Sequence, residues 1–140
     1  MNSWVVDAGV AIKWFLPEDD TESALRLRGH NHRLHAPDFM LLETDNVLWK
    51  HIRRGLISRE ESDSVRAGLR QIPIQYHTFL PLLDLAYSVA LEARRSLYDS
   101  LYIALAIHLD TRLVTADRRL YLALQETSFG QRAIWLADVS

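Results

Sequence analysis

The sequence predicts one α/β domain built around a five-stranded, mainly parallel sheet. Short apolar runs alternate along the chain with longer segments of helical periodicity, which is the pattern of strand–helix–strand units. The chain has 140 residues, a length that suits a single domain. No linker, repeat or low-complexity stretch interrupts it. We therefore expect residues 1–140 to form one domain.

Two strands are expected in the first half of the chain, the apolar run Trp4–Val6 and the weaker Arg33–Ala36. A short helix follows the first strand over Ala8–Leu16 and ends before Pro17. Asp19 or Asp20 can cap a second helix, which runs to about Arg28.

A long helix is expected after Pro37, with Gly55 as its stop. Its apolar residues recur near the helical spacing, and they are Phe39, Leu42, Val47 and Trp49. The capping box Ser58–Glu61 then opens a helix that continues to about Leu69.

Three further strands are expected in the second half, at Ile72–Tyr76, Leu113–Thr115 and Ile134–Leu136. Pro81 suits the first turn of a helix that runs to about Arg94. A second S-x-x-D start, Ser96–Asp99, precedes the apolar helix Leu101–Leu109, and a last helix covers Arg118–Leu124.

Composition excludes several kinds of chemistry. The chain contains no cysteine, which rules out a disulfide framework, a thiolate zinc site and a cysteine nucleophile. It carries 16 Lys and Arg against 18 Asp and Glu, for a net charge of -2. Taken alone, this balance argues against nucleic-acid binding, because such domains usually carry a basic excess. Only Lys13 and Lys50 are lysines.

The beginning of the chain, Met1–Asp7, lacks the basic segment and apolar stretch of a signal peptide. No apolar run approaches the roughly 20 residues that span a bilayer. We therefore expect a soluble cytoplasmic protein that does not enter a membrane.

Four acidic residues are placed where a solvated surface does not explain them. Asp7 and Asp117 each follow a strand, and ligands of open α/β sheets bind outside the carboxyl ends of the strands. Glu43 lies beside apolar residues of the long helix, and Asn46 shares its face. Asp99 stands at the entry to an almost wholly apolar helix.

Each of these acids has a simpler explanation as a cap or turn residue. Together, however, carboxylates without lysine partners would repel one another and resist ionisation. A divalent cation removes the conflict, and oxygen-only ligands suit Mg²⁺ or Mn²⁺ rather than zinc. Such ions can activate water and stabilise a displacement at phosphorus.

These acids lie in four segments that together resemble a PIN domain of the VapC toxin type, over essentially the whole chain. The segments are residues 5–15 (VVDAGVAIKWF), 37–50 (PDFMLLETDNVLWK), 97–106 (LYDSLYIALA) and 113–120 (LVTADRRL). Their order and spacing carry the resemblance, because no single segment is decisive.

The resemblance implies a PIN-like three-layer α/β/α sandwich and a metal-dependent endoribonuclease that is the toxin of a toxin–antitoxin pair. It assigns the site acids and Mg²⁺ or Mn²⁺ ligands to Asp7, Glu43, Asp99 and Asp117. Asn46 and Thr115 match polar positions close to the metal site. The implied partners are RNA, a cognate antitoxin and a second copy of the chain in a homodimer. Gly9 departs from the pattern, since the family commonly has Ser, Thr or Asn there.

Arg118 and Arg119 are the best candidates for an RNA-phosphate contact, because cations at a helix start are disfavoured by the helix dipole. The histidines at 30, 32 and 35 are expected on the surface rather than in a zinc site, and the histidines at 51, 77 and 108 are expected to be isolated. The tryptophans are expected to anchor the core or an interface.

Two other classes of protein with acids at strand ends disagree with the sequence, and one further function remains an alternative. A haloacid-dehalogenase-type phosphatase needs a second Asp two residues after Asp7, where Gly9 stands. A phosphoacceptor receiver domain needs a late strand-end lysine, and none follows Lys50. The serious alternative is a catalytically weak PIN-like scaffold that binds other proteins.

Overall fold

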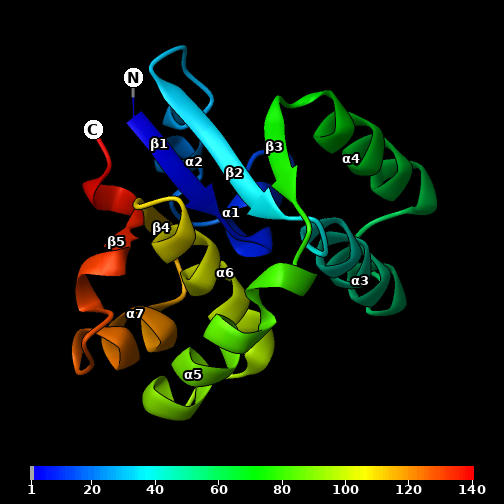
Figure 1. Cartoon of the computed structure of the whole chain (residues 1–140). Coiled ribbons are helices and arrows are strands. Elements are labelled where there is room, and N and C mark those ends of the chain that lie inside the picture. Colours follow the sequence, from blue (N-terminus) through cyan, green and yellow to red (C-terminus); the bar gives the residue numbers. More distant parts are fainter. Residues whose placement is uncertain (1) are drawn as a thin grey trace.

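Five parallel strands form the centre of the molecule, in the order β3-β2-β1-β4-β5 (Figure 1). The computed structural model describes residues 2–140. Its strands are β1 (Asn2–Val6), β2 (His32–Pro37), β3 (Ile74–His77), β4 (Arg112–Thr115) and β5 (Ala133–Trp135). The predicted five-stranded α/β fold is confirmed, and every strand pair is parallel. In β1 and β4 the carboxyl-terminal halves are fully buried, as expected for central strands covered on both faces.

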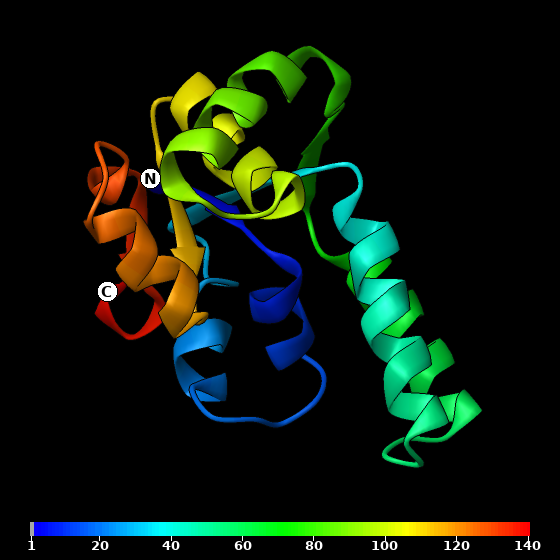
Figure 2. The same cartoon turned by 90° about the horizontal axis from the view of Figure 1, so that it is seen from below.

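Helices cover both faces of the sheet. Figure 2 shows α5 (Leu83–Ala93) and α6 (Leu97–His108) on one side, and α1 (Ala8–Lys13) and α2 (Thr21–Arg26) on the other. Helix α7 (Arg118–Gln125) packs beside β5. Helix α6 is buried along most of its length because it crosses the centre of the sheet against β1, β2 and β4.

Helices α3 (Met40–Arg53) and α4 (Arg59–Gln71) form an arm that extends away from the sheet (Figures 1 and 2). Gly55 ends the first of them with a φ of 72°, a left-handed conformation that glycine adopts without steric cost. The predicted capping box is present, since the Ser58 hydroxyl accepts from the Glu61 N–H and the Glu61 carboxylate accepts from the Ser58 N–H.

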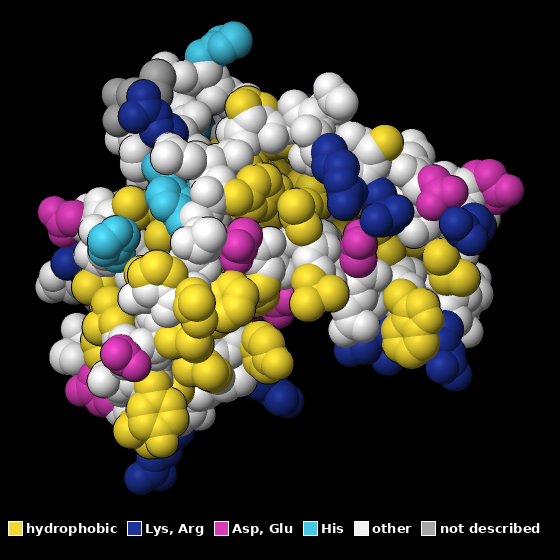
Figure 3. Space-filling view, turned by 45° about the vertical axis from the view of Figure 1, so that its right-hand side comes forward, with side chains coloured by type: hydrophobic (Ala, Val, Ile, Leu, Met, Phe, Trp, Pro, Cys, Tyr) yellow, Lys and Arg dark blue, Asp and Glu magenta, His cyan; other side chains and the backbone are white. Residues whose placement is uncertain are grey.

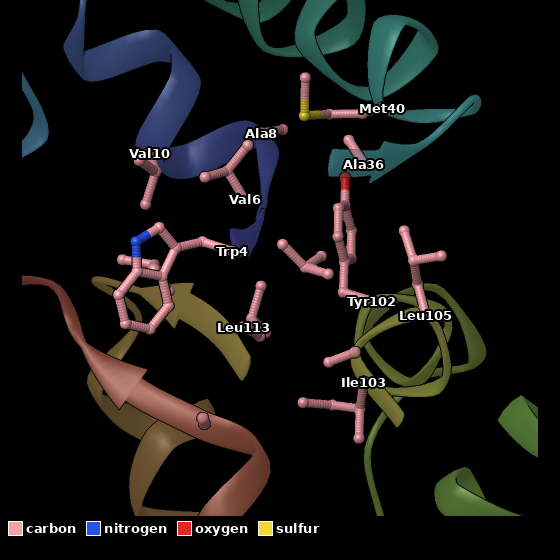
Figure 4. Close-up of a cluster of buried hydrophobic side chains, with 14 of the residues drawn as sticks. Trp4, Val6, Ala8, Val10, Ala36, Met40, Tyr102, Ile103, Leu105 and Leu113 are labelled. Atoms are coloured by element: carbon pink, nitrogen blue, oxygen red, sulfur yellow. The ribbon is translucent and has the colours of Figure 1, made fainter. Parts of the chain in front are cut away.

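The core gathers side chains from β1, β2, β4 and α6. In Figure 4 Leu113 of β4 lies on the side of Ile103 and Tyr102 of α6, whereas Trp4 and Val6 of β1 point to the opposite face, toward Val10 of α1. The indole nitrogen of Trp14 donates a 2.7 Å hydrogen bond to the carbonyl oxygen of Ala24, which joins α1 to α2. Trp4 and Trp14 therefore anchor the core as expected.

The apolar stripe predicted for the long helix is not its buried face. Leu42 and Trp49 are 71% and 52% exposed, and the buried residues of α3 are Met40, Thr44 and Leu48. The prediction failed because α3 belongs to the arm and buries only the narrow face that packs on α1 and α4. Thr44 can be buried there because its hydroxyl donates to the Leu41 carbonyl.

Other local predictions need correction. Asp20 is the N-cap residue of α2 as expected, but it has a φ of 66° and its side chain makes no capping hydrogen bond. The third strand begins at Ile74 rather than Ile72, because Ile72 is the last capping residue of α4 and Pro73 has no N–H to donate. None of the helices within residues 2–140 is long and apolar enough to cross a bilayer.

The histidine predictions are also partly wrong. His35 is buried, and its Nδ1 lies 3.0 Å from Nε2 of His77, so His77 is not isolated. This pair joins β2 to the end of β3. Burial lowers the pKa of His35 below its ordinary value, with the neighbouring His77 as a further cause. His32 accepts a hydrogen bond from the Trp4 indole.

Candidate active site

A pocket of about 280 Å³ opens at the carboxyl ends of β1 and β4 and brings together the four predicted acids, Asp7, Glu43, Asp99 and Asp117. They come from the ends of the two strands and from the first turns of α3 and α6. Figure 3 shows acidic side chains in a hollow beside the arm, bordered by hydrophobic side chains.

Asp7 and Asp117 are neighbours because β1 and β4 pair directly, with Val6 opposite Val114. Each aspartate also caps the helix that follows its strand. One Asp7 carboxylate oxygen accepts a 2.9 Å hydrogen bond from the Val10 N–H, and Asp117 accepts one of 3.1 Å from Leu120. The same two side chains therefore cap a helix and line the pocket, because both helices start at the sheet edge that forms the pocket.

Glu43 is held by a residue that the sequence interpretation did not identify. The Tyr102 hydroxyl donates a 2.5 Å hydrogen bond to Oε1 of Glu43, and the Tyr102 ring lies edge-on to Phe39, with centroids 5.3 Å apart. In Figure 4 the Tyr102 ring extends from α6 toward Ala36 and Met40, at the start of α3. The buried helix therefore fixes the position of an acid on the arm.

Asp99 lies in the first turn of α6, where the Ser96 hydroxyl accepts from its N–H at 3.1 Å. Its own carboxylate does not return to cap the helix but pairs with Nη2 of Arg95 at 3.2 Å. The Asp99 carboxylate therefore does not cap the helix, although its sequence position suggests that role.

The acids perturb one another. Burial raises the pKa of Asp7 to about 7, and the charges of Glu43 and Asp117 add to the effect. Burial also raises the pKa of Glu43, with the charge of Asp99 as a further cause and the Tyr102 hydrogen bond opposing it. Carboxyl groups that resist ionisation beside one another form a site that favours a bound cation.

The donor set fits a hard divalent ion. It consists of carboxylate oxygens with Thr115 beside them, and such oxygen ligands suit Mg²⁺ or Mn²⁺. Within residues 2–140, no three His, Asp or Glu side chains converge closely enough to form a closed cage around one ion. Mg²⁺ does not need such a cage, because it keeps several water ligands and usually takes only one or two carboxylates directly. Asp7, Asp99, Asp117 and Glu43 are the residues that could hold it.

Gly9 lines the pocket, whereas Thr115, Asn46, Arg118 and Arg119 lie around it. Thr115 is fully buried, and its hydroxyl accepts from the Asp117 N–H at 3.0 Å. Asn46 is exposed and lines a neighbouring groove with Leu42, Glu43 and Tyr98, so it shares the face of Glu43 as expected. Arg118 and Arg119 are exposed at the start of α7. A Cβ added to Gly9 would lie 3.5 Å from Oδ1 of Asp7.

Lys13 and Glu18 also line the pocket, and sequence reasoning gave them no role. One available signal was the rarity of lysine, since Lys13 is one of only two in the chain. The loop from Trp14 to Asp20 brings Glu18 back to the end of α1, which the sequence pattern does not reveal.

Comparisons with known proteins identify relatives of this chain. The family model of the PIN domain matches residues 4–123. Ribonuclease VapC3 of Pyrobaculum aerophilum is 34% identical over 118 residues, covering 83% of this chain and 90% of the relative.

Solved structures share the fold. PAE2754 of Pyrobaculum aerophilum has a TM-score of 0.70 and 24% identity, over 97% of this chain and 90% of that one. VapBC2 of Rickettsia felis, solved bound to a DNA fragment from its promoter, has a TM-score of 0.65 and 14% identity, over 95% and 98%. From its sequence match and its four-acid pocket, the chain belongs to the PIN domain family.

Proposed function

We propose that this chain is a Mg²⁺- or Mn²⁺-dependent endoribonuclease and the toxin of a toxin–antitoxin pair. The observation that carries the proposal is the single pocket lined by Asp7, Glu43, Asp99 and Asp117. The relative named Ribonuclease VapC3 supports RNA as the substrate. The likeness to VapBC2 supports a protein partner of the antitoxin kind.

The reaction is hydrolysis of an RNA phosphodiester. The oxygen of a water molecule forms a bond to phosphorus as the bond to the leaving oxygen breaks, one proton of the water passes to the leaving oxygen, and no oxidant or reductant is needed. A divalent ion in the pocket would lower the pKa of water and neutralise charge on the phosphate.

In this proposal Asp7, Asp99 and Asp117 hold one or two ions. Glu43 binds metal or orients the attacking water, and Tyr102 fixes its Oε1 for either task. Thr115 supports the Asp117 backbone through its 3.0 Å hydrogen bond. Asn46 provides a polar group on the groove that adjoins Glu43.

The proposal extends to the partners. Arg118 and Arg119 are exposed beside Asp117 and would contact RNA phosphates. Exposed hydrophobic side chains offer surface for an antitoxin or for a second copy in a homodimer, and they include Leu42, Leu80, Tyr87, Leu91 and Tyr98. The site of action would be the cytoplasm.

The experiment is RNA cleavage by the purified protein in Mg²⁺ or Mn²⁺, with Asp7→Asn, Asp99→Asn and the exposed control Asp84→Asn on α5. Both pocket variants should lose metal-dependent cleavage, and Asp84→Asn should retain it. If Asp7→Asn cuts RNA as fast as the wild type, the site assignment is wrong. A protein-binding scaffold predicts neither cleavage nor stabilisation of the fold by Mg²⁺.

A further inference from the structure

Lys13 brings a positive charge to the acidic pocket. Among the described residues that line the pocket, five are acidic and Lys13 is the one cation. Its side chain is only 11% exposed, although lysine ammonium groups normally remain in water. A lysine held in this position needs an explanation beyond a solvated helix end.

Two contacts hold the ammonium group. Nζ of Lys13 donates to Oε2 of Glu18 at 3.1 Å and to the carbonyl oxygen of Asp19 at 2.8 Å. An ammonium group has three N–H donors, so within residues 2–140 these bonds leave one donor for a ligand in the pocket.

Glu18 is itself held in place. Its N–H donates to the Thr21 hydroxyl at 2.9 Å, and that hydroxyl donates to the Glu18 carbonyl at 2.7 Å. This reciprocal pair fixes the backbone of Glu18, whose carboxylate then fixes Lys13. The partner of Lys13 is thus Glu18, on the loop from Trp14 to Asp20, and not one of the four acids proposed to hold metal.

This placement suits an anionic substrate. A cation with a free donor, in the same pocket as the four carboxylates proposed to hold metal, can contact a non-bridging oxygen of a phosphate that also approaches the metal. Because the ammonium is already oriented and largely removed from water, its effect on developing negative charge is greater than in solution.

We propose that Lys13 binds the scissile phosphate of the RNA and stabilises the charge that its oxygens gain in the transition state, with Glu18 as the residue that positions it. The inference rests on the proposed ribonuclease function. Lys13 transfers no proton in this role, so the bonds and protons exchanged in the hydrolysis are the same as described above.

A purely structural role makes different predictions. If Lys13 only ties the loop from Trp14 to Asp20 to α1, its loss should lower stability and leave cleavage by the folded protein unchanged. Glu18→Gln should then have the same effect as the loss of Lys13. Lys13→Arg, with its different geometry, should then also lower stability and leave cleavage by the folded protein unchanged.

The experiment compares Lys13→Met, Lys13→Arg and Glu18→Gln with the wild type, in saturating Mg²⁺ and well below the melting temperature of each variant. The control is Lys50→Met, which removes the only other lysine from the exposed face of α3. We expect Lys13→Met to lower kcat/KM by about 10²-fold. Lys13→Arg should stay within about tenfold, Glu18→Gln should fall between them, and Lys50→Met should match the wild type.

A second readout is the affinity for a single-stranded RNA oligonucleotide in Ca²⁺, with the RNA recovered intact. Loss of one phosphate contact should reduce the slope of log affinity against log salt by about 0.7 for Lys13→Met. Glu18→Gln keeps the cation and should keep the slope, and so should Lys13→Arg.

The role of Lys13 is refuted if Lys13→Met cleaves as fast as Lys50→Met, or if Lys13→Arg and Glu18→Gln lose as much activity as Lys13→Met. If Lys13→Met does not fold, a Lys13→Arg variant with less than a hundredth of wild-type activity refutes it. A wild type that cleaves no RNA in either metal refutes the proposed function instead.

Discussion

Oε1 of Glu43 accepts a 2.5 Å hydrogen bond from the Tyr102 hydroxyl, which joins the arm to the most buried helix of the fold. Glu43 lies in the first turn of α3, and α3 packs on the domain through only one narrow face. Tyr102 is 3% exposed and cannot follow a moving arm. The hydrogen bond therefore sets where this acid stands relative to Asp7, Asp99 and Asp117.

Tyr102→Phe should separate positioning from packing, because it removes the hydroxyl and keeps the ring. We expect a stability loss of about 1 kcal/mol and a higher Mg²⁺ concentration for half-maximal cleavage. Tyr98→Phe, an exposed tyrosine in the same helix, is the matched control. An unchanged Mg²⁺ dependence would show that the hydrogen bond from Tyr102 is not needed to position Glu43.

Gly9→Ser should place a hydroxyl beside Asp7, at the position where the sequence departs from the pattern that the resemblance implies. Its Cβ would lie at an ordinary 3.5 Å from Oδ1 of Asp7, so the side chain fits. Replacing a glycine within α1 should stabilise the fold by roughly 0.5 kcal/mol. Gly9→Ala isolates this helical effect. If Gly9→Ser reaches half-maximal RNA cleavage at a lower Mg²⁺ concentration than Gly9→Ala, the serine hydroxyl forms a hydrogen bond to the site.

Gly68→Ala should destabilise the arm. A Cβ at this position of α4 would lie 2.5 Å from Cε1 of Phe15, a distance that forces the ring to move. We expect a loss of about 1–3 kcal/mol from overpacking, measured by thermal or urea unfolding. Adding Phe15→Leu should recover part of that loss, and a double variant no better than the single one would argue against this contact as the cause.

The order of elements and the four acids could be predicted because each has a local signal. Asp7 and Asp117 end apolar runs, and parallel strands place their carboxyl ends at one edge of the sheet. The pairing of β1 with β4, which makes the two residues neighbours, is a property of the topology and not of either segment.

What could not be predicted depends on contacts between distant segments. Tyr102 and Glu43 are 59 residues apart, and His35 and His77 are 42 apart. Trp49 follows the spacing of a buried helix face, yet it is exposed because the arm offers no surface to cover it. Periodicity reports that a helix has an apolar side, and tertiary packing decides which side is buried.

His35→Gln should reduce the loss of stability in mild acid. The pKa values of His35 and His77 are lowered chiefly by burial. At a pH between these lowered values and the ordinary pKa of 6.5, the unfolded chain therefore binds more protons than the folded one. Stability therefore falls as the pH drops below 6.5, and the loss ends once the folded pair is protonated. Tyr76, Arg33 and His108 are the other titratable groups near the pair.

The measurement is the urea midpoint of the wild type and His35→Gln between pH 7.5 and 5, with the exposed His30→Gln as control. The variant keeps a hydrogen-bonding side chain but cannot be protonated. Parallel curves for the wild type and His35→Gln would show that this histidine does not contribute to the pH dependence.

Charge reversal at Arg118 and Arg119 should weaken RNA binding. Both side chains are exposed at the start of α7, immediately after Asp117, and neither forms a salt bridge within the part of the chain that the structure describes. If each contacts one phosphate, the slope of log affinity against log salt should fall by about 0.7 per contact for a single strand. The same reversal at Arg53 and Arg54, a basic pair at the far end of α3, controls for net charge. Equal losses from the two pairs would mean that RNA responds to overall charge, whereas a loss confined to Arg118 and Arg119 would place the RNA backbone along the start of α7.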